Sequence, residues 1–276
     1  MFQPAIPLSG IGGWKFLQST YTRQLESFTD SPQVRNDRDY MLDKLSQPMS
    51  VDDFMADKRL LRVTMTAFGL GGEEWKGGFI RKALDEVADP ESTFLARLNN
   101  AKYTDFAESL LPIDGKIIMS SSALAKIAVN FEAQSFQTAV GNVDDSMRLA
   151  LNYQSEIADM VGTDASDKTI LYRILGDVPV RTVMETAFNL PEGISSLDLD
   201  RQAEVFKERI TSVLGISDLS ELSSPEMTEK MIHRFLAMET IENGSSSYSS
   251  ASAALTLLSN GVGSQASENL FLSLLS

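Results

Sequence analysis

Hydrophobic side chains recur at helical spacing along almost the whole chain. Near the N-terminus Trp14, Leu17, Tyr21, Leu25 and Phe28 follow one another at steps of three or four residues, which places them on one face of a helix. The same spacing returns repeatedly, whereas strict alternation of apolar and polar residues is hard to find. The pattern predicts helices over residues 14–28, 34–45, 50–68, 74–87, 92–99, 103–111, 122–140, 143–161, 168–176, 180–188, 198–214 and 225–242. We therefore expect an all-α fold.

Capping residues delimit several of these helices. Ser50 followed by Asp53 is the pattern of a capping box, in which short side-chain oxygens accept hydrogen bonds from the first free N–H groups. A break in that helix is expected near Asp57. Asn142 is expected to start the helix over 143–161, and Gly162 to end it.

Strand material is scarce. Residues 116–119, which follow an Asp-Gly turn, are the one plausible strand. Since a single short strand cannot form a sheet, we predict none.

An internal similarity links two helix ends that lie 120 residues apart. Residues 63–70 (VTMTAFGL) match residues 183–190 (VMETAFNL). Gly69 in the first copy is replaced by Asn189 in the second, and both residue types readily adopt the left-handed conformation that ends a helix. A hydrophobic residue, Leu70 or Leu190, then follows in position to fold back on the last turn. This match predicts two related multi-helix lobes.

The predicted domains are an N-terminal helical lobe over residues 1–119, a C-terminal helical lobe over 120–243 and a tail over 244–276. The tail is rich in Ser, begins like a flexible linker and then predicts two short apolar helices. Such an apolar tail is expected to dock, on its own protein or on a partner. Its candidate docking residues are Leu255, Leu258, Leu270, Phe271, Leu274 and Leu275.

Composition excludes several kinds of chemistry. The chain of 276 residues contains no Cys and one His, so disulfides, thiolate nucleophiles and sites with two His ligands are impossible. Its 24 Lys and Arg against 38 Asp and Glu give a net charge of −14. This balance argues against nucleic acid, because phosphate binding needs clustered cations. No segment predicts insertion into a membrane and no signal peptide is recognised, so we expect a cytoplasmic location.

The candidate catalytic groups have simpler structural explanations. His233 lies opposite the apolar face of its helix, one turn from Glu229, so we interpret it as a solvated surface residue rather than a general base. Ser120–Ser122 and Ser166 are typical of helix caps, and no pattern of a serine nucleophile surrounds them.

Acidic pairs and glycine clusters likewise fit structural roles. Asp52-Asp53 and Asp144-Asp145 fall in first helical turns, where negative charge is favoured, and Asp198-Leu199-Asp200 lacks the glycine of a calcium loop. The glycines at 10–13 and 69–72 lack the spacing of nucleotide-binding loops. Trp14 and Trp75 are expected in the core. We therefore expect no cofactor, no metal and no enzymatic activity.

Several segments resemble one family. The most specific is Asp57-Lys58-Arg59-Leu60-Leu61-Arg62 with Ala67-Phe68-Gly69-Leu70, and the similarity extends over the body from Trp14 to Met238. These segments resemble an alphaproteobacterial domain of unknown function, family 1217, whose members are typically encoded among flagellar genes. The other matching segments are Gly13–Gln18, Val51–Val63, Phe79–Leu84, Val140–Asn142, Met147–Leu151 and Met231–Leu236.

The resemblance implies a link to the flagellum, so a flagellum-associated location becomes an alternative to the cytoplasmic one. It supplies no activity or catalytic residue. We expect a non-enzymatic protein that serves flagellar structure, assembly or regulation by contacts with protein partners. Two alternatives stay open: a small-molecule sensor or enzyme with a carboxylate-lined pocket between the lobes, and a helical adaptor unrelated to motility. The first would require a buried group of acids with raised pKa values.

Overall fold

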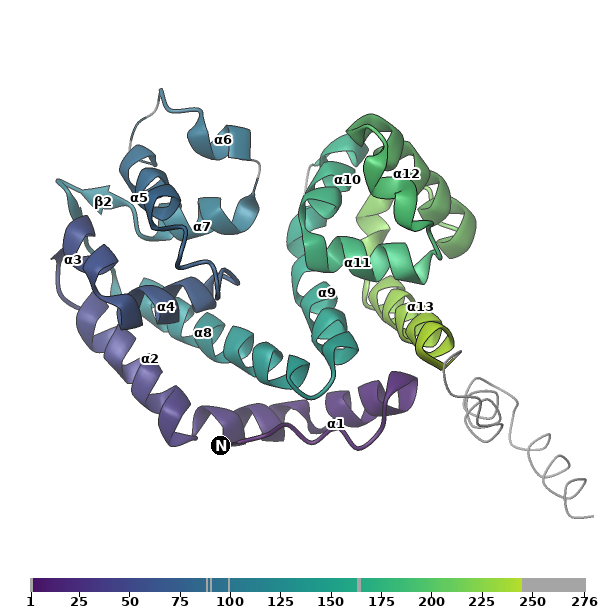
Figure 1. Ribbon diagram of the computed structural model, residues 1–276, viewed down its shortest axis with the longest axis horizontal. Coiled ribbons are helices and arrows are strands. Elements are labelled where there is room, and N and C mark those ends of the chain that lie inside the picture. The colour runs from purple at the N-terminus through teal and green to yellow at the C-terminus, as the bar shows by residue number, and fades with distance from the viewer. Residues whose placement is uncertain (1, 88, 90, 99, 163–164, 245–276) are drawn as a thin grey trace, which may run out of the picture. The chain divides into compact units, whose positions relative to one another are not determined.

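The computed structural model describes residues 2–87, 89, 91–98, 100–162 and 165–244, and within them the protein is almost entirely helical (Figure 1). The all-α prediction is confirmed. The chain divides into one compact unit, Met1–Met238, and a second, Glu239–Ser276. The helices are α1 (Gly10–Thr29), α2 (Pro32–Leu45), α3 (Val51–Ala56), α4 (Lys58–Ala67), α5 (Gly77–Glu86), α6 (Phe94–Leu98), α7 (Ala101–Ser109), α8 (Ser121–Gly141), α9 (Asp145–Val161), α10 (Asp167–Gly176), α11 (Val178–Ala187), α12 (Leu199–Leu214) and α13 (Pro225–Gly244).

A small sheet does form, so that prediction was wrong. The strands β1 (Met49–Ser50), β2 (Pro112–Ile113) and β3 (Lys116–Ile117) are antiparallel in the order β1-β3-β2. Asp114 and Gly115 both have positive φ and form the two-residue turn between β2 and β3. Strand β1 was missed because two residues carry no alternating pattern, and only the fold brings them beside β3.

The long helices α8 and α9 follow one another through a short turn and pack on each other, and the other helices of the first compact unit are assembled around them (Figure 1). Helix α4 and helix α2 pack on α8, whereas α11 packs on α9 (Figure 1). Helix α8 follows the predicted lobe boundary in sequence, yet it contacts helices from both sides of that boundary. The division at residue 120 stays a prediction.

The two similar segments fold alike. Asp57 caps α4 by accepting a hydrogen bond from Leu60 N, and Asp177 caps α11 by accepting one from Val180 N. At the other ends Gly69 and Asn189 have positive φ, as predicted. Leu70 N then donates to the carbonyl of Met65, and Leu190 N to that of Glu185. Gly69 N also donates to the Thr66 carbonyl, and Asn189 N to the Thr186 carbonyl, so each helix end has the paired bonds of a Schellman motif.

The core-facing positions of the two segments correspond as well. Leu60, Val63 and Ala67 of α4 are buried, and so are Val180, Val183 and Ala187 of α11. Each helix therefore presents one apolar stripe to the long helix beneath it.

Most predicted caps are confirmed, with one correction. Ser50 caps α3, and Asp57 separates α3 from α4, as expected. Helix α9 is capped by Asp144, which accepts from Ser146 N and Met147 N, and not by Asn142. Asn142 still has helical dihedral angles because α8 continues up to it.

Candidate functional site

The docking residues proposed in the tail, Leu255 to Leu275, lie outside the described residues. The structure therefore neither supports nor contradicts them. The candidate sites below all belong to the compact unit Met1–Met238.

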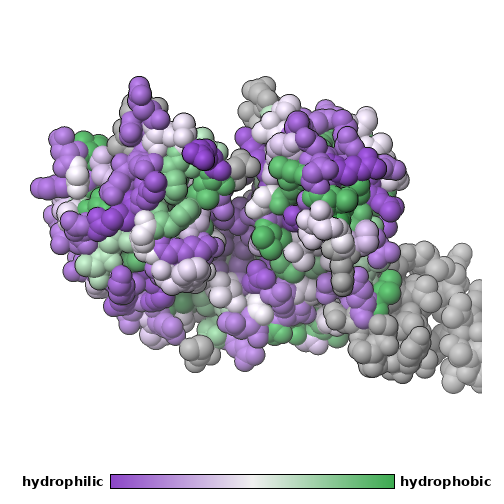
Figure 2. Space-filling view, turned by 45° about the horizontal axis from the view of Figure 1, so that its top comes forward, coloured by the Kyte–Doolittle hydropathy of each residue, from purple (hydrophilic) through white to green (hydrophobic). Residues whose placement is uncertain are grey.

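A polar cleft of about 1220 Å³ opens along α8. The end of α4, the loop after it and the start of α7 form one wall, and α9 with the start of α11 forms the other. In Figure 2 it is the shaded hollow near the middle of the view, with hydrophilic residues in its depth. Representative lining residues of this polar cleft are Thr66, Lys102, Gln134, Arg148, Asn152 and Pro179.

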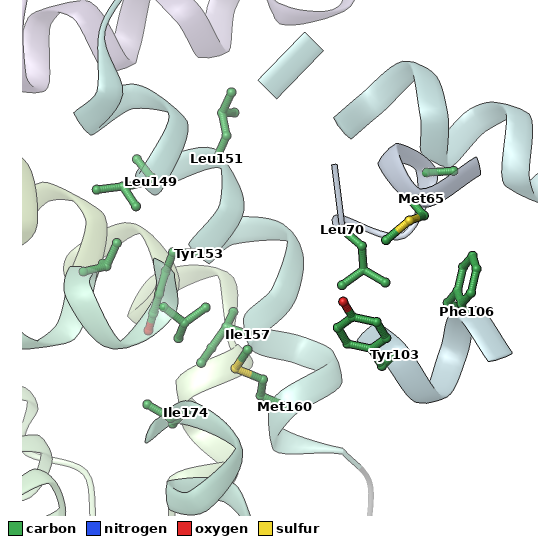
Figure 3. Close-up of a cluster of buried hydrophobic side chains, with 14 of the residues drawn as sticks. Met65, Leu70, Tyr103, Phe106, Leu149, Leu151, Tyr153, Ile157, Met160 and Ile174 are labelled. Carbon is green, nitrogen blue, oxygen red and sulfur yellow. The ribbon is translucent and has the colours of Figure 1, made fainter. Parts of the chain in front are cut away.

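One face of helix α9 is apolar and packs in the core, and another face is polar. Figure 3 shows Leu149 and Tyr153 pointing from α9 away from the side on which Leu70 and Tyr103 lie. Asn152 and Glu156 are one turn apart on a different face of α9. The helical period thus sends the apolar residues into one part of the core, whereas Asn152 lines the cleft.

An ion pair crosses between the two walls. Lys102 Nζ lies 2.8 Å from Asp177 Oδ2, and the two side chains are only 18% and 12% exposed. Asp177 is held in place because it also caps α11. The aliphatic carbons of Lys102 run past Gly69, where an added Cβ would lie 3.5 Å from its Cδ and Cε atoms.

Glu156 sits in a negative environment beside this ion pair. Burial and the carboxylates of Asp177, Asp159 and Asp105 raise the pKa of Glu156, and Lys102 alone acts in the opposite direction. Glu156 has no hydrogen bond or ion pair with any described residue. We call Asp105, Glu156, Asp159 and Asp177 the acid cluster.

Asn152 adds an unsatisfied acceptor to the cleft wall. Its side chain is 6% exposed, and its Oδ1 atom has no hydrogen-bond partner among the described residues. A buried acceptor without a partner costs free energy, on the order of 1–3 kcal/mol. Neither Asn152 nor Glu156 was identified from the sequence. Their four-residue spacing does indicate one polar face of a helix, but nothing in the sequence shows that this face meets Lys102.

Trp75 contradicts its sequence prediction. Trp14 is in the core at 3% exposure, as expected, whereas Trp75 is 80% exposed. The helix predicted from residue 74 begins only at Gly77, so Trp75 lies in a loop and not on an apolar helix face. Beside it is a shallow hollow of about 520 Å³ lined in part by Phe79, Leu98 and Tyr103.

The residues that flank Trp75 in its loop, Glu73 and Lys76, are both held by side-chain contacts. Glu73 accepts a hydrogen bond from the Tyr103 hydroxyl and forms an ion pair with Lys76 at 2.8 Å. The Lys76 ammonium in turn lies 5.5 Å from the centroid of the Trp75 ring. The exposed indole is therefore presented on a fixed loop. We call Trp75 and this hollow the Trp75 surface.

His233 lies as predicted beside Glu229 on α13, with Nε2 3.6 Å from Glu229 Oε1. Its environment differs from the prediction in one respect. The side chain is partly exposed, but Nε2 itself is buried and has no hydrogen-bond partner among the described residues. The interpretation as a solvated surface residue holds for part of the imidazole only, because the Nε2 atom is buried.

The acidic pairs and serine runs have the structural roles assigned to them. Asp198, Ser120 and Ser166 cap α12, α8 and α10, and Asp200 pairs with Lys168. In the described ranges, no three His, Cys, Asp or Glu side chains are arranged to hold a metal ion. The described helices also include none long and apolar enough to cross a membrane.

The most specific sequence segment, residues 57–62, is explained by packing. Leu60 and Leu61 are fully buried. Arg59 and Arg62 each lie 2.8 Å from Asp37 of α2, and together they hold the pKa of Asp37 below its usual value although burial alone would raise it. Asp57 accepts a hydrogen bond from the Tyr40 hydroxyl at 2.6 Å. This segment thus fastens α4 to α2.

Comparison with known proteins identifies a family and one similar fold. The sequence profile of the family described as "Protein of unknown function (DUF1217)" matches residues 67–228. The crystal structure of protein AGR_C_984 from Agrobacterium tumefaciens is similar, with a TM-score of 0.67 and 25% identity over 87% of this chain and 99% of that one. No curated protein matches the chain significantly.

Proposed function

The chain belongs to the DUF1217 family, and from this premise we propose that it is a non-enzymatic protein that serves flagellar structure, assembly or regulation by contacts with protein partners. Membership in the family supports the flagellar role because, as the resemblance implies, members of this family are typically encoded among flagellar genes. The proposal places the protein in the cytoplasm or at the flagellum.

The observation that carries the contact role is the exposure of Trp75. Tryptophan buries a large apolar area when it meets a partner, and it is among the residues most enriched at the centres of protein interfaces. A ring that is 80% exposed on an anchored loop is already in position to bind, so little conformational entropy is lost on association. The neighbouring apolar hollow provides room for a side chain of the partner.

A deletion strain complemented with variants tests the proposal. Loss of the gene should abolish or impair swimming, and the wild-type gene should restore it. Trp75→Ala should fail to restore swimming and should recover less partner protein, although the folded protein persists. Val129→Ala, which shortens another exposed apolar side chain, is the matched control and should restore swimming fully.

The outcomes separate the parts of the proposal. Normal swimming and normal filaments in the deletion strain would contradict the flagellar role and favour an adaptor unrelated to motility. Impaired swimming that Trp75→Ala restores completely would keep the flagellar role and eliminate the Trp75 surface.

The tail is a second contact element of this proposal. Removal of residues 244–276 should weaken partner binding or motility while the compact unit stays folded. Unchanged motility together with unchanged partner recovery would eliminate the tail.

Fluorescence offers a direct test with purified protein. Trp14 and Trp75 are the two tryptophans of the chain, so a Trp14→Phe variant reports on Trp75 alone. Its emission should be that of a solvated indole and should shift to shorter wavelength when the partner binds.

A further inference from the structure

The two walls of the polar cleft belong to different groups of helices. Helices α2 to α7 lie on one side and α9 to α12 on the other, and among the described residues the extensive packing between the two sides passes through α1 and α8. In Figure 1 α8 and α9 diverge from the turn that joins them at residues 142–144. The two sides are therefore held together at this turn, whereas the walls need contacts of their own to stay close.

One ion pair provides such a contact. Lys102 Nζ on α7 lies 2.8 Å from Asp177 Oδ2 at the start of α11, and both side chains are largely shielded from water. The other carboxylate oxygen, Oδ1, accepts a hydrogen bond from Val180 N at 3.0 Å, so the charge is fixed to α11. Within the described residues, this is the one ion pair that joins α2–α7 to α9–α12 and its caps. Lys102 also lines the cleft, so the pair closes one of its edges.

Apolar packing adds little across the cleft. Apart from Pro179, the residues that the two walls present to it are polar or glycine: Arg62, Thr66, Gly69, Gly71, Gly72, Glu74 and Lys102 on one wall, and Arg148 and Asn152 on the other. In Figure 3 Tyr153 of α9 points away from the side on which Leu70 and Tyr103 lie. Since the hydrophobic effect scales with buried apolar area, it contributes little to holding these two walls together.

We propose that the Lys102–Asp177 ion pair is a latch of the polar cleft. While it is formed, it holds the two walls together; when it is released, the α9–α12 side tilts away from the α2–α7 side about the turn at 142–144 and the cleft widens. The structure shows the latched form, and the open form is a minor state whose population rises when the latch is weakened. This device does not depend on the flagellar role or on the Trp75 surface.

Distances between two spin labels test the latch directly. The chain contains no Cys, so Ser109→Cys on α7 and Ser212→Cys on α12 provide one exposed labelling site on each side of the cleft. Double electron–electron resonance on the full-length protein with these two labels reports the separation of the two sides. With the latch intact, we expect a single narrow distance distribution.

Loss of either charge should open the cleft. Lys102→Met keeps the length of the side chain, and Asp177→Asn keeps the Oδ1 cap of α11. Each leaves the other charge shielded from water without a counter-ion, which costs free energy until the walls part and water reaches it. Both variants should therefore shift the mean distance upward by more than about 2 Å, the scale of a domain rearrangement.

The matched control is Lys207→Met. Lys207 Nζ also lies 2.8 Å from an aspartate, Asp167, but this pair joins α12 to the start of α10 on one side of the cleft. Its loss should leave the distance distribution unchanged.

Circular dichroism and thermal unfolding separate a latch from an ion pair that only stabilises the fold. An ion pair of the latter kind lowers the melting temperature, and the folded protein well below that temperature keeps the wild-type distances. A latch changes the distances in the folded protein itself. Because the two variants act from opposite walls, each is an independent test.

Two results would overturn the proposal. The first is a folded Lys102→Met or Asp177→Asn variant with the wild-type distance distribution. The second is an equal shift in Lys207→Met, which would show that the distance responds to the loss of any ion pair.

Discussion

Helices α4 and α11 have the same length and the same ends, yet their polar residues serve different purposes. Both begin at an Asp cap and end in a left-handed residue followed by a buried or half-buried Leu. In α4 the Asp cap binds the Tyr40 hydroxyl of the neighbouring helix α2. In α11 the Asp cap binds Lys102, across the polar cleft.

Some positions are the same in α4 and α11, and others differ. The kept positions are those that any helix needs when it packs on a long neighbour: a cap, an apolar stripe and a left-handed end. The varied positions are polar and partly exposed, and their partners come from other helices. One copy consequently strengthens the scaffold, and the other contributes to a charged cleft.

Truncation of the buried stripe should produce the largest effects. We expect Leu60→Ala to lower the free energy of unfolding by about 3 kcal/mol and Val180→Ala by about 2 kcal/mol, because three and two buried carbons are lost and cavities remain. Denaturant unfolding measures both. Val178→Ala, at an exposed position of α11, should change stability by less than about 0.5 kcal/mol. Equal losses at all three positions would show that the two stripes are not core.

Substitutions of the capping residues Asp57 and Asp177 should have the next largest effects on stability, and the two residues should differ. Asp→Ala at either position removes a cap, at a cost of about 1 kcal/mol or more. Asp→Asn keeps the cap, so Asp57→Asn should cost less than about 1 kcal/mol, whereas Asp177→Asn should cost about 1–2 kcal/mol because its largely buried ion pair is lost. Equal costs of the two Asn variants would contradict the comparison.

The pH dependence of the stability difference between the wild type and Asp57→Asn tests whether the charge of Asp57 causes that difference. Burial tends to raise the pKa of Asp57, but hydrogen bonds from Leu60 N and the Tyr40 hydroxyl hold it below its usual value. The charged form therefore stabilises the fold at neutral pH, and this contribution is lost as the pH falls through the folded pKa. The difference between wild type and Asp57→Asn should disappear in acid.

The left-handed helix ends should tolerate exchange of their own two residue types and no others. Gly69→Ala should cost about 1–2 kcal/mol because it adds a Cβ at positive φ, and Asn189→Ala should cost about 1 kcal/mol because it removes the short polar side chain that makes this conformation accessible to Asn. A Cβ at Gly69 would meet ordinary contacts at 3.5 Å, so conformation and not space sets the cost. Gly69→Asn should lose less than about 1 kcal/mol and Asn189→Gly should be near neutral. Melting temperatures of the four variants test this prediction. An Ala variant that is as stable as the Asn or Gly variant at the same position would contradict it.

The smallest expected effect is an increase in stability, caused by a substitution of Thr64. Thr64 of α4 is fully buried, and its hydroxyl has no hydrogen-bond partner among the described residues, whereas the corresponding residue of α11 is the apolar Met184. Thr64→Val should raise the free energy of unfolding by up to about 1 kcal/mol, because an unsatisfied polar group is removed without a change of shape. Thr66→Val removes a hydroxyl that does bond, to the Arg62 carbonyl, and should not stabilise.

Helix positions, and most helix ends, could be predicted from the sequence because their causes are local. A stripe of apolar residues and a capping oxygen act within a few residues of each other, as at Ser50 and Asp53. The small sheet could not be predicted, because β1 pairs with a strand far along the chain. Trp75 was misplaced for a related reason: the loop before α5 is fixed by Glu73 binding to Tyr103 of another helix.

By itself, the sequence determined the helical class, the two matching helices with their caps and left-handed ends, and the family resemblance. Those features depend on spacing and on the conformational preferences of single residues. The tertiary structure alone decided that Asn152 and Lys102 line the same cleft, that Lys102 pairs with Asp177, and that Trp75 is exposed. The physical reason is that burial and charge at a site are sums over neighbours from distant segments, and only packing of those segments brings them together.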